Sequence, residues 1–345
     1  MFSLHRLKNR SSPCIIAVNA GLVNFILWKI SIMGYMKTIL SLDIGGTNIR
    51  AGLFSENSTK PFFIKKIRTS GQNCTPLENI INLIAELQQE QPRIDAISMA
   101  VPGSIDNKHG VIIKAPNVGG WKNMPLRDII SEKFGIVPSI ENDASMAAYG
   151  EWKHGAGRGH DYLLYMTIST GIGGAVIDDG HLLTGFRGLG TEKGHMTIVE
   201  NGPLCSCGQP GHLEALASGT AIAAYVRRKM AEGAKTILEA DPAPTAETIA
   251  KAARKGDALS IEAYHDAGYY LGVGLANYLH IFNPSCIILG GGVSFSGELF
   301  YEPFYASLKQ HVLSEEYLAG LEINYAQLGD DAGLIGAYQW SLDHL

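Results

Sequence analysis

The chain has 345 residues, enough for two domains of ordinary size, and 46% of them are hydrophobic. A charged fraction of 18% and a formal net charge of -5 argue against a disordered chain and against general binding to nucleic-acid phosphates. The five cysteines are few and odd in number, which favours a reducing compartment and a metal site over a disulfide framework.

Residues 1–35 combine a basic start with an apolar run. Basic side chains between His5 and Arg10 precede the run from Cys14 to Trp28. This run is shorter than the about 20 residues of a membrane span, and no clear signal-peptide cleavage site follows it. Because Met36 leads directly into a strand pattern, we interpret residues 1–35 as an extension outside the fold, with a membrane anchor as the alternative.

A strand, a Gly-Gly turn and a second strand open the folded part of the chain. The letters TILSLD, IGGT and NIRAGLF predict a hairpin whose turn holds Gly45, Gly46 and Thr47. The bare N–H groups of such a turn bind phosphate, and Asp43 beside it is suited to hold magnesium through water. A plain hairpin, with glycines for geometry alone, is the alternative.

The next segment predicts alternating strands and helices that lead to a second acidic position. Strands are expected at 62–67, 95–101 and 136–140, and helices at 77–89 and 125–134, with Asn117 in a loop between them. The last strand runs into Asn142 and Asp143, where another helix begins and continues through Trp152. Such a pair either caps the helix or binds a hydroxyl with Asp143 as general base, and by themselves these residues favour the cap.

After a turn-rich break at 155–161, which we interpret as a hinge, the opening pattern recurs. A strand at 162–168 leads into the turn Ser-Thr-Gly-Ile-Gly-Gly, with Thr170 and Gly171, and a second strand begins near Ala175. Two matched copies predict a duplicated architecture with a nucleotide between the halves. Further on, helices are expected at 220–232, 245–256 and 258–282. A strand at 285–289 ends in Gly290 and Gly291, where backbone can pack against a flat ligand such as adenosine, and a final helix returns to the first domain.

Four possible zinc ligands lie close together in the sequence after the second turn. They are His195, Cys205, Cys207 and His212, which can form a closed tetrahedral site. Glu192 precedes the first ligand by three residues and Glu214 follows the last by two, so a bound metal would fix both carboxylates. A pair of ordinary loop thiols is the alternative.

Taken together, these motifs resemble the ROK family of sugar kinases and repressors, and most of all its bacterial ATP-dependent glucokinases. The resemblance covers about Met36 to the C-terminus and rests on LSLDIGGTNIRAGLF, VPG…APN, ENDA, STGIGG, TEKGH…CSCGQPGHLE and LGGG. It implies an α/β, two-domain actin/hexokinase/Hsp70-like ATPase fold. Its ribonuclease H-like duplicated domains would hold nucleotide and sugar in the interdomain cleft. The expected parts are the extension 1–35, a small domain of 36–147 and 330–345, and a larger domain of 148–329 with the zinc site.

The resemblance also implies roles for single residues. Asp143 would be the base that takes the proton from the sugar hydroxyl, and Asp43 would position magnesium. The sugar would be held by Asn117, Asn142, Asp143, Glu192, His195 and Glu214. The phosphate turns would be Gly45, Gly46, Thr47, Thr170 and Gly171, the adenosine turn Gly290 and Gly291, and the zinc ligands His195, Cys205, Cys207 and His212. The chain departs from the family where His212 replaces the usual last cysteine and where Gly190-Thr191 stands before Glu192.

The expected activity is ATP-dependent phosphorylation of a hexose at its C6 hydroxyl, with glucose favoured. Fructose, mannose, allose, N-acetylglucosamine and N-acetylmannosamine remain alternatives, as does a transcriptional regulator or sugar sensor without catalysis. The expected cofactors are ATP, Mg²⁺ and structural Zn²⁺. We expect a cytoplasmic protein without a nucleic-acid or membrane partner, and the resemblance implies a homodimer or homotetramer. Nucleic-acid binding is disfavoured because the chain is acidic and the 35 residues before the first turn are apolar, unlike the basic arm of the family's repressors.

Overall fold

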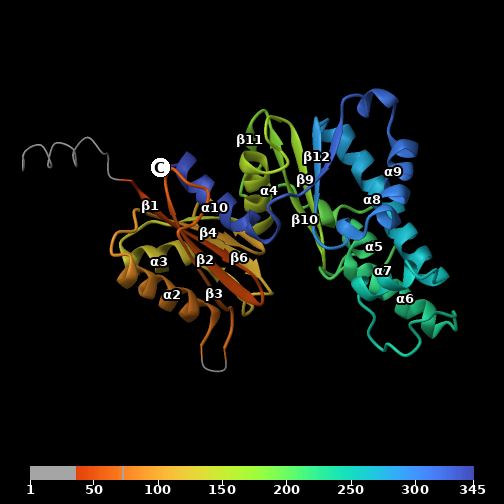
Figure 1. Ribbon diagram of the computed structural model, residues 1–345, viewed down its shortest axis with the longest axis horizontal. Coiled ribbons are helices and arrows are strands. Elements are labelled where there is room, and N and C mark those ends of the chain that lie inside the picture. The colour runs from red at the N-terminus through yellow and green to blue at the C-terminus, as the bar shows by residue number, and fades with distance from the viewer. Residues whose placement is uncertain (1–35, 72–73) are drawn as a thin grey trace, which may run out of the picture. The chain divides into compact units, whose positions relative to one another are not determined.

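The computed structural model describes residues 36–71 and 74–345, and residues 38–345 form one compact unit. The interpretation of residues 1–35 as an extension therefore lies outside the described residues. Two five-stranded sheets carry most of the architecture (Figure 1). In the described part of the chain, no helix is long and apolar enough to cross a membrane.

The first sheet has the strand order β3-β2-β1-β4-β8. Its first three strands pair antiparallel, whereas β4 and β8 run parallel to β1. The central strands read as nearly continuous apolar runs because both faces of the sheet are covered. The strands are β1 (Thr38–Ile44), β2 (Asn48–Ser55), β3 (Phe63–Arg68), β4 (Ala96–Val101) and β8 (Ser139–Asn142).

The second sheet repeats this arrangement, with the order β11-β10-β9-β12-β13. Again the first three strands pair antiparallel, and the last two run parallel to the central strand. The strands are β9 (Leu163–Ile168), β10 (Ile172–Asp178), β11 (His181–Leu182), β12 (Cys286–Gly290) and β13 (Glu322–Tyr325). The predicted duplication of strand, glycine turn and strand is thus confirmed.

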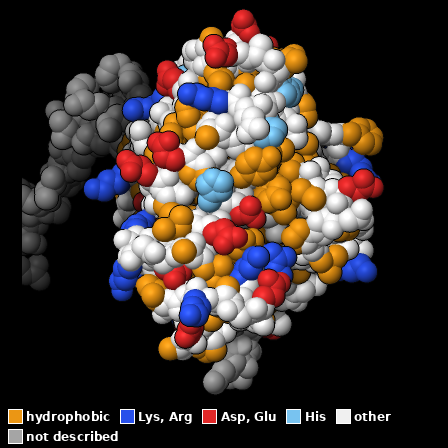
Figure 2. Space-filling model, turned by 90° about the vertical axis from the view of Figure 1, so that its right-hand side faces the viewer, with side chains coloured by type: hydrophobic (Ala, Val, Ile, Leu, Met, Phe, Trp, Pro, Cys, Tyr) orange, Lys and Arg blue, Asp and Glu red, His pale blue; other side chains and the backbone are white. Residues whose placement is uncertain are grey.

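Helices cover the sheets in three layers (Figure 1). The first sheet packs against α2 and α3, the second against α5 to α9, and α4 and α10 lie between the two sheets. The helices are α2 (Pro76–Glu90), α3 (Leu126–Phe134), α4 (Asp143–His154), α5 (Leu213–Ala217), α6 (Gly219–Ala231), α7 (Ala246–Ala253), α8 (Ala258–Phe282), α9 (Glu298–His311) and α10 (Ala332–Asp343). Figure 2 shows the side that carries the outer helices, where acidic and basic side chains are interspersed around hydrophobic ones.

Strand alternation explains how one strand serves two cores. Leu164 and Met166 of β9 join the core with α8, whereas Leu163 and Tyr165 join the core with α4. The two middle helices approach each other closely, because a Cβ on Gly336 of α10 would lie 1.7 Å from the Met146 carbonyl oxygen. The C-terminal helix also packs against the first sheet, where Leu334 and Tyr338 share a core with Ile39 and Phe54.

The structure corrects several predicted elements. The strand predicted at 136–140 begins only at Ser139, because Pro138 cannot donate a ladder hydrogen bond, and it extends to Asn142. The helix α9 was not predicted, since Pro303 lies inside it. The short, half-exposed strand β13 and a three-stranded sheet of β5 (Ser104–Asp106), β6 (Val111–Ala115) and β7 (Trp121–Met124) were also not predicted.

Candidate functional site

Parallel strands bring the predicted acidic residues to one edge of the first sheet. In register, Asp43 of β1 lies opposite Ala100 of β4, and Ala100 lies opposite Glu141 of β8. The carboxyl ends of these three strands therefore meet, and such edges are where open α/β sheets bind ligands. Asp143 follows directly, as the first residue of α4.

Asp143 is both oriented and desolvated. The Ala144 N–H donates to its Oδ1 at 2.8 Å, and Asn142 beside it caps the helix, its Oδ1 accepting from the Ser145 N–H at 3.1 Å. Burial raises the pKa of Asp143, and the nearby Glu192 carboxylate raises it further. The helix cap expected from the residues alone is thus formed by Asn142, so the Asp143 carboxylate is not the N-cap.

Asp43 faces the same region. Burial raises its pKa to about 6, and the charge of Asp143 contributes to the rise. The start of α10 packs against this carboxylate, because a Cβ on Gly333 would lie 3.1 Å from Asp43 Cγ. Two neighbouring carboxylates with raised pKa values are unfavourable without a cation, which suits a site that holds magnesium beside Asp43.

A polar cavity of about 100 Å³ opens beside Asp143. Both halves of the chain contribute to its wall. The first supplies Asn107, Glu141, Asn142 and Asp143, and the second supplies Gly173, Gly174, Thr184, Gly188, Thr191 and Glu192. The structure thus brings together three predicted sugar ligands, Asn142, Asp143 and Glu192, in a cavity rich in hydrogen-bonding groups.

Two residues of this cavity were missed from the sequence. Glu141 is 6% exposed and accepts a hydrogen bond from Asn107 Nδ2, and burial raises the pKa of its carboxyl to about 7. Its place directly before Asn142 was a usable signal. Asn107 gave no signal, because only the folding of the small sheet brings it to the cavity.

The first glycine turn lies between β1 and β2. Gly45 N–H donates to the Asn48 carbonyl at 2.9 Å, and Gly46 and Thr47 are exposed at the tip. A Cβ on Gly46 would lie 3.0 Å from the carbonyl oxygen of Asn117, so this predicted sugar ligand packs against the turn. Asn117 is not among the residues that line the small cavity, and its contact with sugar stays a prediction.

The second glycine turn lies between β9 and β10, and Glu214 supports it. Glu214 Oε2 accepts from the Ile172 N–H at 3.0 Å and would lie 2.4 Å from a Cβ on Gly171, so any larger residue there would displace this carboxylate. The helix α6 begins next to this turn, where Thr220 Oγ1 donates to the Thr170 carbonyl at 2.7 Å. A helix N-terminus beside exposed turn residues favours an anionic group such as phosphate.

The four predicted metal ligands form one cluster. Their ligand atoms all lie within 4.8 Å of one another, with His195 Nδ1 3.6 Å from Cys205 Sγ and Cys207 Sγ 3.2 Å from His212 Nδ1. Two thiols and two imidazoles at this spacing match the donor set of a tetrahedral zinc site. Burial and the neighbouring His195 lower the pKa of His212, which favours the neutral imidazole that binds metal.

Glu214 connects this cluster with the second glycine turn. Glu214 Oε1 accepts from Ser206 Oγ at 3.0 Å and from the Cys205 thiol at 3.6 Å, while its other oxygen holds the second glycine turn. His195 therefore lies in the His/Cys cluster, and Glu214 lies between this cluster and the second glycine turn. Neither residue lines the small cavity. The contact of His195 and Glu214 with sugar stays a prediction. His195 would use Nε2 for this contact, because its Nδ1 faces Cys205.

A larger cavity of about 770 Å³ lies on the second half of the chain. It begins at Ser169 and Thr170 of the glycine turn and extends between α6, α7 and the segment after β12. Gly292 lines it, whereas Gly291 turns the chain against Ile168, where a Cβ would lie 2.3 Å from the carbonyl oxygen. The predicted adenosine turn, Gly290 and Gly291, thus supports the cavity, and Gly292, the third glycine of this run, lines it. Residues not singled out from the sequence also form its wall, among them Arg227, Arg254 and Phe295.

Comparison with known proteins gives a consistent result. The sequence pattern of the ROK family matches residues 39–344. A glucokinase from Thermotoga maritima is 35% identical over 306 residues, which cover 87% of this chain and 95% of that protein. The xylose repressor of Bacillus subtilis is 33% identical over 310 residues, covering 90% of this chain and 75% of the repressor.

A solved structure shows the same fold. The crystal structure of a ROK family glucokinase from Streptomyces griseus in complex with glucose and AMPPNP superposes with a TM-score of 0.71 at 33% identity. The alignment covers 88% of this chain and 98% of that one. The predicted two-sheet ATPase fold is confirmed by this similarity.

Proposed function

The chain belongs to the ROK family, and on that premise we propose that it is an ATP-dependent sugar kinase that converts glucose to glucose 6-phosphate. The observation that carries the proposal is the position of Asp143. Its carboxylate lines a small polar cavity shared by both halves of the chain and lies near Asp43 and the first glycine turn. The similarity to glucokinases favours glucose among the hexoses.

In the proposed reaction, Asp143 is the general base. The Asp143 carboxylate accepts the proton of the C6 hydroxyl while the hydroxyl oxygen forms a bond to the γ-phosphorus of ATP. The bond between the γ-phosphorus and the bridging oxygen breaks, and ADP leaves. Burial suits this role, because a carboxylate with a raised pKa is a stronger proton acceptor. General-base catalysis of this kind contributes about 10²- to 10⁴-fold.

The remaining residues bind and position. Asn142 and Glu192 line the sugar cavity, and the exposed residues of the two glycine turns are suited to the phosphates. When bound beside Asp43, magnesium supplies positive charge that offsets the charge developing on the phosphoryl oxygens. Holding both substrates in one geometry supplies much of the rate enhancement.

Zinc has a structural role in this proposal. His195, Cys205, Cys207 and His212 would hold the metal, which fixes the segment between Glu192 and Glu214. Because Glu214 holds the second glycine turn, this segment links the sugar cavity to the phosphate-binding turn. The few, unevenly spaced cysteines and ATP as substrate favour a cytoplasmic location, and a homodimer or homotetramer is the proposed assembly.

An ADP-release assay across a panel of sugars tests the proposal. We expect glucose to give the highest kcat/KM among glucose, mannose, fructose, allose, N-acetylglucosamine and N-acetylmannosamine. If another sugar gives the highest kcat/KM, that sugar replaces glucose as the proposed substrate. If none of these sugars is phosphorylated, the proposal of a sugar kinase is wrong. The second candidate is then a sugar-responsive regulator, favoured by the similarity to the xylose repressor and tested by a gel shift with upstream DNA.

A further inference from the structure

We propose that the phosphoryl-donor site accepts purine nucleoside triphosphates with little discrimination between their bases, so that GTP and ITP replace ATP. This inference rests on the proposed kinase function and on the cavity of about 770 Å³ beside the second glycine turn. The turn is at the end where the phosphates would lie, so the base would enter the part of the cavity between α6, α7 and the segment after β12.

Apolar groups form much of the surface that a base would meet. Ala223 of α6, Ala250 of α7 and Val293 are buried hydrophobic residues in the wall, and Pro244 is a buried ring before α7. Phe295, 54% exposed, adds an aromatic face at the opposite side. Such surfaces pack against or stack on any purine, because every base has a π face.

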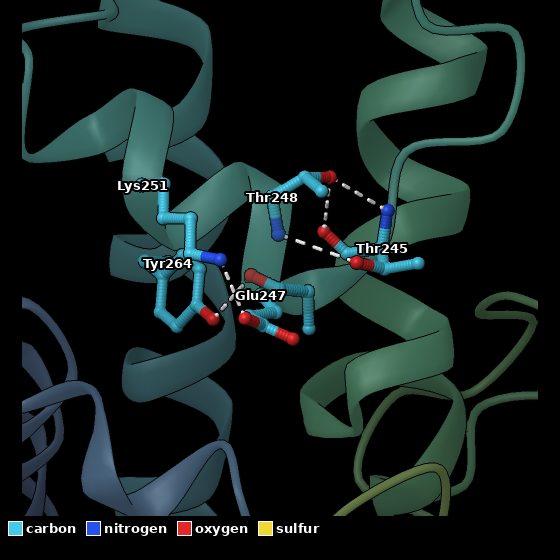
Figure 3. Close-up of polar contacts among 6 residues, drawn as sticks. Thr245, Glu247, Thr248, Lys251 and Tyr264 are labelled. Carbon is cyan, nitrogen blue, oxygen red and sulfur yellow. Dashed lines mark hydrogen bonds and ion pairs between the residues drawn. The ribbon is translucent and has the colours of Figure 1, made fainter.

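The buried polar side chains of this wall are already hydrogen bonded to each other or to backbone. The Tyr264 hydroxyl, drawn in Figure 3, donates to the Ala246 carbonyl at 2.8 Å. It also accepts from Ser296 Oγ at 3.3 Å. Both side chains are more than nine-tenths buried, so neither can turn to a base without leaving its partner unsatisfied.

Polar groups at the rim are also engaged, as Figure 3 shows for the start of α7. Thr245 and Thr248 satisfy each other in a capping box, and Glu247 pairs with Lys251 at 2.6 Å. Arg254 donates to the Ser296 carbonyl at 3.2 Å and, like Arg227, is exposed, so water competes for its remaining donors.

The polar contacts that a site makes decide how strongly it rejects a substrate analogue. A site that pairs with a substrate group rejects an analogue lacking that group by about 10⁴- to 10⁵-fold, whereas an apolar pocket discriminates by only about 10- to 200-fold. ATP, GTP and ITP share the purine ring system and differ in polar substituents at its edge. We therefore expect their kcat/KM values to lie within about 100-fold of each other, the discrimination that an apolar pocket achieves.

The test measures glucose phosphorylation with ATP, GTP and ITP, each with excess magnesium, by formation of glucose 6-phosphate. Values within about 100-fold of each other support the inference. A preference for ATP above 100-fold overturns it while leaving the kinase intact. No transfer from any of the three is a different result, because it overturns the proposed function itself.

A variant gives an independent readout. Phe295→Ala removes the exposed aromatic face and should raise KM for all three nucleotides by the same factor, about 5- to 100-fold, with KM for glucose unchanged. Val137→Ala, at an exposed position outside the cavity lining, is the matched control and should change neither. An effect of Phe295→Ala on one nucleotide alone would refute base-independent binding.

Discussion

Replacing Glu141 by Gln tests whether the buried carboxyl of the small cavity is held at a cost. Glu141 is 6% exposed, and burial raises its pKa from 4.5 to about 7. In the folded protein, the ionised form is therefore disfavoured by about 3 kcal/mol relative to the unfolded chain. Gln has the same shape, remains neutral, and keeps an oxygen that can accept from Asn107 Nδ2.

The sign of the pH effect follows from the raised pKa. The folded state binds the Glu141 proton more tightly than the unfolded state, so the wild type loses stability as pH rises from about 4.5 through about 7. Glu141→Gln lacks this loss. It should exceed the wild type by less than about 1 kcal/mol near pH 5 and by about 3 kcal/mol at pH 8, and the latter corresponds to about 5 °C in Tm for a chain of this length.

Thermal unfolding at pH 5 and pH 8, without sugar or nucleotide, measures the effect. Glu132→Gln, an exposed glutamate on α3, is the matched control and should show no comparable pH-dependent difference. Equal stability of Glu141→Gln and wild type at pH 8, or a difference that is the same at both pH values, would refute the reasoning that the carboxyl is desolvated.

Four further predictions concern catalysis, metal binding and packing. Asp143→Asn should bind glucose by calorimetry yet lose turnover by about 10²- to 10⁴-fold, and near-normal turnover would remove Asp143 from the base role. In the wild type, kcat/KM should fall as pH drops through about 6, because Asp43 and Asp143 act as carboxylates and burial raises both pKa values. Metal analysis should find about one zinc per chain, with zinc lost in His212→Ala and retained in His212→Cys; a fully active, zinc-free protein would exclude a structural role. Gly336→Ala should lower stability by more than about 1 kcal/mol, since its Cβ would lie 1.7 Å from the Met146 carbonyl oxygen, and unchanged Tm would contradict the close helix contact.

Local sequence patterns were sufficient to predict helices and hairpins whose ends carry capping or turn residues. The helix predicted at 258–282 is observed as α8 over the same residues, because Asp257 caps its start and Asn283 adopts a left-handed conformation before Pro284. Both hairpins were also predicted, since each strand pair is joined by a short glycine turn. By contrast, β13 is four residues long and half-exposed, which leaves too weak a pattern for prediction.

Sequence by itself determined the repeated strand-turn-strand units, the four side chains of the candidate zinc site and the position of Asp143 as the candidate base, since each depends on residues that are close along the chain. The tertiary structure decided which of these residues share a cavity. Parallel pairing of β1, β4 and β8 brings Asp43, Glu141 and Asp143 to one edge, and the small sheet adds Asn107. The tertiary structure also placed Glu214 between the His/Cys cluster and the second glycine turn, because that position depends on a contact across more than 40 residues of chain.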